Sequence, residues 1–262
     1  MKTFKFFPIF IFIALLFGAC EFDNFNEPEI GLTGKLKFEE QFLNTRQNVL
    51  FRLYQYKEDG YLAANERPIE IRVDQEGKYN ALLFPGRYKM TVNPESGVNY
   101  VHKWKDFPTN ESGELDTLYF DISKNKTLDF EVIPYYKIKD FEAKFERDSV
   151  VAHFNIEKLT VIDDNRITGF RNVSLFLSPT MHVNNDTPVS FAKRVSDVKP
   201  GQDIEIVAPL NTYYSNSFYK NNFRTYVYVR LGISLRVSAQ EFIYSKVIKV
   251  EGIPQETINK YK

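Results

Sequence analysis

The feature that most constrains the fold is an alternation of apolar and polar side chains that recurs after the first 30 residues. The cleanest example is IEIRVDQ, in which Ile69, Ile71 and Val73 alternate with Glu70 and Arg72. Successive side chains of a β-strand point to opposite faces of the sheet, so this spacing predicts a strand with one buried and one solvated face. No helical period of 3.6 residues persists beyond one or two turns. The pattern predicts an all-β fold of antiparallel β-sandwiches in series.

The first predicted sandwich covers residues 30–134. Leu32, Leu36 and Phe38 share one face of its first strand, and alternation over this stretch predicts about seven strands in all. Pro134 ends the last run and cannot donate a hydrogen bond to a central ladder, so it marks the predicted domain boundary. Two tyrosines follow before alternation resumes, which indicates a short, stiff connection.

The second predicted sandwich covers residues 135–252 and is immunoglobulin- or fibronectin-like. Val150, Ala152, Phe154 and Ile156 form the apolar face of one run. Further runs occupy residues 172–178, 203–208, 225–234 and 241–250. Residues 253–262 are expected to form a C-terminal tail.

The first 20 residues predict where the protein works. Lys2 and Lys5 precede an apolar run over residues 6–17, and Gly-Ala-Cys ends the segment at Cys20. This order is typical of a secretory signal peptide, here residues 1–19. The small-small-Cys ending resembles a bacterial lipobox, in which Cys20 carries the lipid, although Phe17 stands where leucine is usual.

This segment has two other interpretations. A transmembrane helix needs about 20 apolar residues, whereas this run is shorter, is interrupted by Pro8 and meets acidic residues at once. The second alternative is that Cys20 is an ordinary cysteine buried in a protein core. Residues 20–29 are acidic and lack a structural pattern, so they predict a solvated tether. Such an acidic cluster after the cysteine resembles the surface-export signal of Bacteroidetes lipoproteins, and we expect a lipid-anchored, outward-facing outer-membrane protein.

Charge and cysteine content exclude some classes of protein. The whole chain has 34 basic and 34 acidic residues; removing residues 1–19 takes away two lysines and leaves 32 − 34 = −2. A nearly neutral chain is not expected to bind nucleic acid. Since Cys20 is the sole cysteine, disulfides are excluded and stability must come from the apolar cores.

Four sequence elements carry a family resemblance. They are GLTGKL (31–36), FRLYQY (51–56), LFPGRY (83–88) and TLDFEVIPYYKI (127–138). They resemble the Bacteroidetes outer-membrane lipoprotein family called domain of unknown function 3823, over nearly the whole mature chain. The resemblance implies a prealbumin-like or carboxypeptidase-regulatory-like sandwich followed by an immunoglobulin-like one. It also implies association with starch-utilisation-type systems, whose transporter and substrate-binding lipoprotein would be partners, and it brings no catalytic residues.

A search for catalytic or metal-binding patterns finds none. His102, His153 and His182 have no metal-ligand spacing, and nucleophile-elbow, Walker A and dinucleotide glycine patterns are absent. The adjacent acids at 39–40 and 163–164 are the only notable carboxylate pairs. Adjacent acids in strands face opposite sides, and in loops they usually face water. No catalytic residue, metal or cofactor is therefore predicted.

Two aromatic stretches are the candidate ligand-binding segments. Trp104 lies in NYVHKWKDFP, and Tyr213, Tyr214, Phe218 and Tyr219 lie among Asn and Ser in residues 211–223. Tyr/Ser/Asn mixtures are typical of recognition loops, and aromatic rings stack against sugars. The same rings could instead cover the ends of the sandwich, and for Trp104 packing is the favoured interpretation because lysines flank it.

The functional expectation is a non-enzymatic surface lipoprotein, accessory to polysaccharide capture, that binds glycans weakly through aromatic loops. The alternative is a structural partner of an outer-membrane transport complex, and a third is a glycoside hydrolase. Thr117 and Ser149 each lie in an Asp-Ser/Thr-apolar triplet that resembles an O-glycosylation acceptor. Both lie in or beside predicted strands, so their modification stays open.

Overall fold

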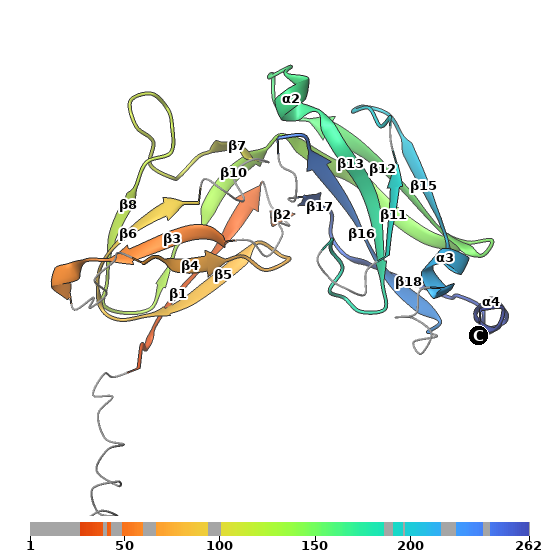
Figure 1. Cartoon of the computed structure of the whole chain (residues 1–262), viewed down its shortest axis with the longest axis horizontal. Helices are drawn as coiled ribbons and strands as arrows, with labels where there is room; N and C mark the ends of the chain where they lie inside the picture. Colours follow the sequence, from red (N-terminus) through yellow and green to blue (C-terminus); the bar gives the residue numbers. More distant parts are fainter. Residues whose placement is uncertain are drawn as a thin grey trace, which may run out of the picture.

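A computed structural model of the chain describes residues 27–38, 41–42, 49–59, 67–93, 101–185, 191–195, 197–215, 224–237 and 242–261. Strands dominate this part of the chain, and they form two domains that stand side by side (Figure 1). The helices α2, α3 and α4 have only four, six and five residues. The predicted all-β fold class is therefore confirmed.

The first domain consists of two sheets packed face to face. One sheet has the antiparallel order β4 (Ile69–Arg72), β3 (Val49–Gln55), β6 (Gly86–Val92) and β8 (Leu118–Ile122). A short 3₁₀ turn, η2 (Lys57–Asp59), follows β3. The other sheet is built around β1 (Ile30–Phe38), with β2 (Gln41–Phe42), β5 (Lys78–Leu83), β7 (Val101–Trp104), β9 (Lys126–Thr127) and β10 (Phe130–Pro134).

The sheet around β1 differs from the expectation in one respect, because two of its pairings are parallel. Leu36 pairs with Phe130 of β10, and Leu32 pairs with Lys126 of β9, both in parallel register. Alternation reports which face of a strand is buried and carries no information on the direction of its partner. The purely antiparallel arrangement expected for this sheet is therefore corrected at β9 and β10.

An aromatic cluster fills the core of the first domain. The ring of Phe51 lies 5.2 to 6.1 Å, centroid to centroid, from the rings of Tyr79, Trp104, Phe107 and Phe130. Edge-to-face and offset contacts of this kind contribute beyond the area they bury. The high aromatic content of the chain is thus used here to build a core without disulfides.

Gly34 has a steric role at this core. The Tyr79 hydroxyl donates a hydrogen bond to the Leu128 carbonyl across Gly34. A Cβ at position 34 would lie 1.8 Å from that carbonyl oxygen, so only glycine permits this approach of two backbone segments. The second glycine of GLTGKL is therefore required by packing.

The second domain is also a sandwich of two sheets. One sheet has the order β11 (Tyr136–Glu146), β12 (Ser149–Lys158) and β15 (Ile204–Pro209). The other has the order β14 (Phe191–Val195), β13 (Phe170–Ser178), β16 (Tyr226–Leu235) and β17 (Ile243–Tyr244), with β18 (Ile248–Glu251) also on β16. The predicted apolar face of β12 is confirmed, since all four of its side chains are buried.

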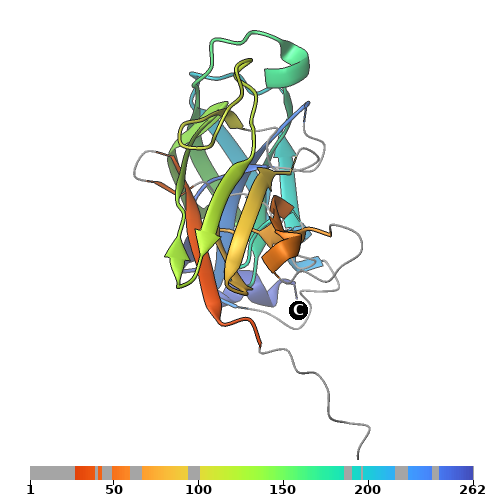
Figure 2. The ribbon, with the colours of Figure 1, turned by 90° about the vertical axis from the view of Figure 1, so that its left-hand side faces the viewer.

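The domains are joined closely. β10 ends at Pro134 and β11 begins at Tyr136, so a single residue separates the two sandwiches. Gln75 of the first domain also contacts the second domain. Its backbone carbonyl accepts a hydrogen bond from the Arg230 guanidinium, and its side-chain amide donates one to the Met181 carbonyl. Seen from the side of the first domain, the two sandwiches lie one behind the other (Figure 2).

Most of the segment expected as a C-terminal tail is docked on the second domain. It contains α4 (Gln255–Asn259), where Thr257 and Ile258 are buried. The Tyr261 ring stacks on that of Tyr214 at 5.5 Å between centroids.

In the residues that the structure describes, no helix has the length and apolar character needed to cross a membrane.

Candidate functional site

The tyrosines that were predicted to bind a ligand are buried. Tyr213 and Tyr214 lie in α3 (Leu210–Ser215), and each is 1% exposed. The Tyr214 hydroxyl donates to the Arg224 carbonyl at 3.1 Å. Rings held this way have no free face for a sugar, so the prediction of an exposed platform at these two residues is wrong. The other two members of the proposed platform, Phe218 and Tyr219, lie outside the described residues.

Trp104 is also a core residue. It is 7% exposed and meets Phe107 edge to face at 5.6 Å between centroids. Its indole N–H has no acceptor among the residues that the structure describes. Apolar packing therefore holds this ring, and the packing interpretation applies to it rather than ligand stacking.

The acidic pair at 163–164 has structural roles. Asp164 caps α2 (Asn165–Thr168) by accepting from the Arg166 backbone N–H at 2.9 Å, and hydrogen bonds from Arg166 lower the pKa of its carboxyl group. Asp163 is 97% exposed and pairs with Lys158 at 3.0 Å. A helix N-cap and a solvated ion pair are structural roles, and neither indicates a general acid or a general base. The other pair, residues 39–40, lies outside the described part of the chain.

The three histidines are dispersed. The His102 imidazole lies 3.5 Å from the Thr160 hydroxyl, and the His153 imidazole lies 3.6 Å from a Glu205 carboxylate oxygen. His182 is exposed. Across the described ranges, no group of three or more His, Cys, Asp or Glu side chains is placed to hold a metal ion.

Three predicted modification positions have different outcomes. Cys20 lies outside the described residues. Thr117 precedes β8 and Ser149 begins β12, and both are partly buried. Their modification stays a prediction.

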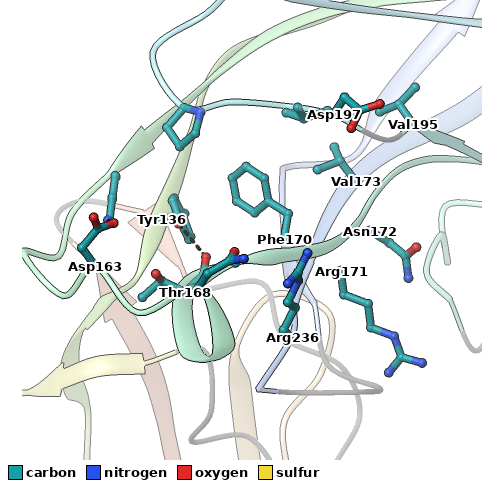
Figure 3. A pocket seen from close by; sticks show the side chains of 15 residues that line it. Tyr136, Asp163, Thr168, Phe170, Arg171, Asn172, Val173, Val195, Asp197 and Arg236 are labelled. Atoms are coloured by element: carbon teal, nitrogen blue, oxygen red, sulfur yellow. Dashed lines mark hydrogen bonds and ion pairs between the residues drawn. The ribbon is translucent and has the colours of Figure 1, made fainter.

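A pocket lies beside α2 (Figure 3). Helices α2 and α3 lie at opposite ends of the second sandwich (Figure 1). The volume of the pocket is about 540 Å³, which falls in the range of small-ligand sites. The wall comes from the β12–α2–β13 connection, the β14–β15 connection and the end of β16. It is lined by Tyr136, Lys158, Asp163, Asn165, Thr168, Gly169, Phe170, Arg171, Asn172, Val173, Val195, Asp197, Val198, Pro200 and Arg236.

Two hydrogen bonds to backbone carbonyls hold the α2 wall of this pocket in place. The Tyr136 hydroxyl donates to the Thr168 carbonyl at 2.6 Å, and the Arg236 N–H donates to the Gly169 carbonyl at 2.8 Å. A Cβ at position 169 would lie 2.2 Å from the Asn165 carbonyl oxygen, so glycine is needed there. The wall is thereby tied to β11 and to the end of β16.

Phe170 stands in the middle of the pocket. Its ring lies 4.7 Å from that of Tyr136, centroid to centroid, and it is only partly buried. In Figure 3 the Phe170 ring has Asp197 and Val195 above it and Arg236 close below, whereas the Arg171 side chain points away. The arrangement places one aromatic ring among polar groups.

The polar groups around Phe170 are planar. Asn165 and Asn172 offer amides, Arg236 a guanidinium and Asp197 a carboxylate. Such groups donate and accept hydrogen bonds in pairs, as the vicinal hydroxyls of a sugar require. Burial raises the pKa of Tyr136, whose hydroxyl is committed to Thr168, so this group serves structure. The set is suited to binding a neutral polar ligand.

Two family descriptions match the chain. Residues 30–133 match "Protein of unknown function (DUF3823) N-terminal domain", and residues 136–249 match "Domain of unknown function (DUF3823_C)". The chain belongs to the DUF3823 family. The resemblance drawn from GLTGKL and the three other elements is therefore confirmed.

Solved structures agree with the DUF3823 fold. A DUF3823 family protein from Parabacteroides merdae is 24% identical, with 86% of this chain and 100% of that chain covered and a TM-score of 0.63. A second, from Bacteroides ovatus, is 23% identical, with 87% and 100% covered and a TM-score of 0.60. A protein from Bacteroides uniformis, provisionally described as carbohydrate-binding, is 13% identical, with 86% and 99% covered and a TM-score of 0.57. No curated protein matches the chain.

Sequence reasoning missed the pocket of this DUF3823 protein. Its residues come from segments that are up to 100 positions apart, from Tyr136 to Arg236. The usable local signal was the polar run IDDNR followed by GFRN, which sets an aromatic ring beside amide and guanidinium groups where a strand begins. Residues 211–223 are richer in aromatic side chains, which is why the sequence predicts the site there.

Proposed function

We propose that this protein is a non-catalytic, lipid-anchored glycan-binding module of the bacterial outer membrane, accessory to polysaccharide capture, with its site in the pocket around Phe170. The observation that carries the proposal is the combination of one partly exposed ring with planar polar side chains in about 540 Å³. The Bacteroides uniformis neighbour, provisionally described as carbohydrate-binding, supports the same ligand class.

The affinity follows from the composition of the site. Stacking on an aromatic ring contributes about 1 kcal/mol beyond area burial, and the pocket offers one ring, Phe170, with a partly exposed face. Hydrogen bonds from Asn172 and Arg236 replace bonds to water and add little net free energy. Binding is then in the millimolar range. Many lipid-anchored copies on one surface would convert such weak sites into useful avidity.

The partner alternative has its own support. On the first domain, Leu82 is 66% exposed and Tyr119 is 62% exposed. Leu82 lies in β5 and Tyr119 in β8, which belong to different sheets, so each would mark its own contact with another protein, such as an outer-membrane transporter or its substrate-binding lipoprotein. Co-purification from membranes with and without a Leu82→Glu/Tyr119→Glu change tests this alternative directly.

The experiment for glycan binding uses the full-length protein in mild detergent. Affinity electrophoresis against a panel of neutral polysaccharides should show retardation that an Asn172→Ala/Arg236→Ala variant loses. Asn211→Ala is the matched control, because Asn211 is exposed in α3 at the opposite end of the sandwich. Retardation on no gel, or an equal effect of the control, refutes the site. Release of reducing sugar by the purified protein would refute the non-catalytic assignment.

A further inference from the structure

A second and larger cavity, of about 1080 Å³, lies between the two domains. Phe38 and Gln75 of the first domain contribute to its wall, and Tyr228, Arg230 and Tyr244 of the second domain face them. Ligand sites form preferentially at domain interfaces, because two rigid bodies supply the walls of a ready-made cleft.

The most unusual group in this wall is the Arg230 side chain, which is 1% exposed. Its guanidinium donates to three backbone carbonyls: Ser245 at 2.9 Å, Val183 at 3.4 Å and Gln75 at 2.6 Å. A guanidinium has five N–H donors, so 5 − 3 = 2 are left by these bonds. The cation also lies 4.3 Å above the centroid of the Tyr244 ring.

None of these partners carries a negative charge. Among the described residues no carboxylate lies within ion-pair distance of Arg230, and Glu76 is paired with Lys78. Burial lowers the pKa of Arg230 to about 10, and the opposing electrostatic effects of Tyr244, Asp74 and Glu76 are smaller. Buried charges are normally paired. An anion in the cavity would supply the missing countercharge.

Gln75 in the wall of the same cavity has a buried oxygen without a hydrogen-bond donor among the described residues. That atom is Oε1, whereas the Nε2 atom of Gln75 donates to the Met181 carbonyl at 3.3 Å. A buried amide oxygen without a partner costs free energy that a ligand hydroxyl would recover. Around both groups the cavity lining has five basic and three acidic side chains, a formal excess of two positive charges.

We infer that the cavity between the domains binds a sugar acid, a pyranose that carries a carboxylate. The carboxylate accepts from the Arg230 guanidinium, a ring hydroxyl donates to Gln75 Oε1, and the apolar face of the sugar packs on Tyr228, whose ring is partly exposed. Both polar contacts are needed, because a simple carboxylate leaves Gln75 unsatisfied and a neutral sugar leaves Arg230 without a countercharge. The inference does not depend on the pocket around Phe170.

The test is calorimetry on the full-length protein in mild detergent, with D-galacturonate as the probe. D-galactose is its neutral counterpart, and acetate is a carboxylate without hydroxyls. We expect galacturonate to bind about tenfold more tightly than galactose, because galactose lacks the charge-assisted bidentate contact to Arg230. We also expect it to bind about tenfold more tightly than acetate, because acetate leaves the buried Gln75 Oε1 without a donor. Equal binding of acetate or of galactose overturns the inference, and so does absence of galacturonate binding.

Three variants sharpen the result. Gln75→Glu is nearly isosteric and sets a carboxylate beside Arg230, so it should abolish galacturonate binding. Arg230→Lys should weaken binding about tenfold, because an ammonium lacks the planar fork. Glu76→Gln is the matched control at the neighbouring position, and it should bind at least as tightly as the parent because it removes a repelling charge.

Thermal unfolding checks that each variant is folded. If Arg230→Lys does not fold, the result for Gln75→Glu alone tests the inference. Unchanged galacturonate affinity in folded Gln75→Glu overturns the inference and assigns Arg230 to domain docking only. Asn172→Ala/Arg236→Ala should leave galacturonate binding intact. A negative result for glycan binding at the pocket around Phe170 can therefore be distinguished from a negative result for galacturonate binding in this cavity.

Discussion

The Arg230 guanidinium donates to the backbone carbonyl of Gln75 at 2.6 Å, although the two residues are 155 positions apart and belong to different sandwiches. The same side chain bonds the Ser245 carbonyl within its own domain. One buried cation therefore connects the second sheet of the C-terminal domain to the turn between β4 and β5.

Replacing Arg230 with alanine should destabilise the protein. The buried carbonyls of Val183 and Ser245 and the partly buried carbonyl of Gln75 would lose their donor. We expect a loss of about 2–4 kcal/mol in the free energy of unfolding, measured by urea denaturation. The control is Arg236→Ala six positions later, where the side chain is exposed and the change should stay within about 0.5 kcal/mol. Equal stability of both variants would contradict the role of Arg230.

Tyr214 should be needed for stability and not for glycan binding. Tyr214→Phe removes the hydroxyl that donates to the Arg224 carbonyl and should cost about 1 kcal/mol. Tyr214→Ala also removes the ring from the core and its stacking on Tyr261, and should cost about 3–5 kcal/mol. Urea denaturation measures both. A stable Tyr214→Ala variant with altered glycan retention would reverse this assignment.

Docking of α4 should depend on pH through Asp148. Hydrogen bonds from Lys260 and Thr257 lower the pKa of the Asp148 carboxyl group below its ordinary value of 3.8. Because the pKa of Asp148 is lower in the folded state, its carboxylate stabilises the fold fully at a pH above the unfolded-state pKa. This stabilisation is lost as the pH falls through the folded-state pKa. The melting temperature of the parent should therefore fall more steeply between about pH 5 and pH 2 than that of Asp148→Asn.

Asparagine is the suitable replacement for that test. Asp148 has a φ of 64°, and asparagine tolerates this left-handed conformation. It also keeps an oxygen that can accept from Thr257. Asp121→Asn, at an exposed position of β8, should leave the pH profile unchanged. Parallel profiles for parent and Asp148→Asn would show that the carboxylate does not hold α4.

Membrane attachment should depend on Cys20. Its thiol is the predicted acyl acceptor, and acyl chains hold a protein at a bilayer through buried methylene groups. In cells that express Cys20→Ala, we expect the protein to move from the membrane fraction to the soluble fraction, followed by immunoblotting. Cys20→Ser is a second variant without a thiol and should behave alike. Unchanged membrane retention would rule out the lipid anchor.

The sequence by itself determined which side chains of each strand are buried. Ile71 and Val73 face the core while Glu70 and Arg72 are exposed, as their spacing predicted. This succeeds because the period of two is a property of the local backbone, and burial of one face follows from it. The family motif could also be recognised from the sequence, because position 34 of GLTGKL requires glycine: no other residue permits the close contact there.

Only the tertiary structure decided the partners of those strands and the places of the large polar and aromatic side chains. The parallel pairing of β1 with β10, the burial of Tyr214 and of Trp104, and the meeting of Arg230 with Gln75 all join distant segments. A tyrosine or tryptophan has an apolar body with a polar tip and suits a core or a binding surface equally well. Its position is set by which segments pack around it, and that is a property of the assembled fold.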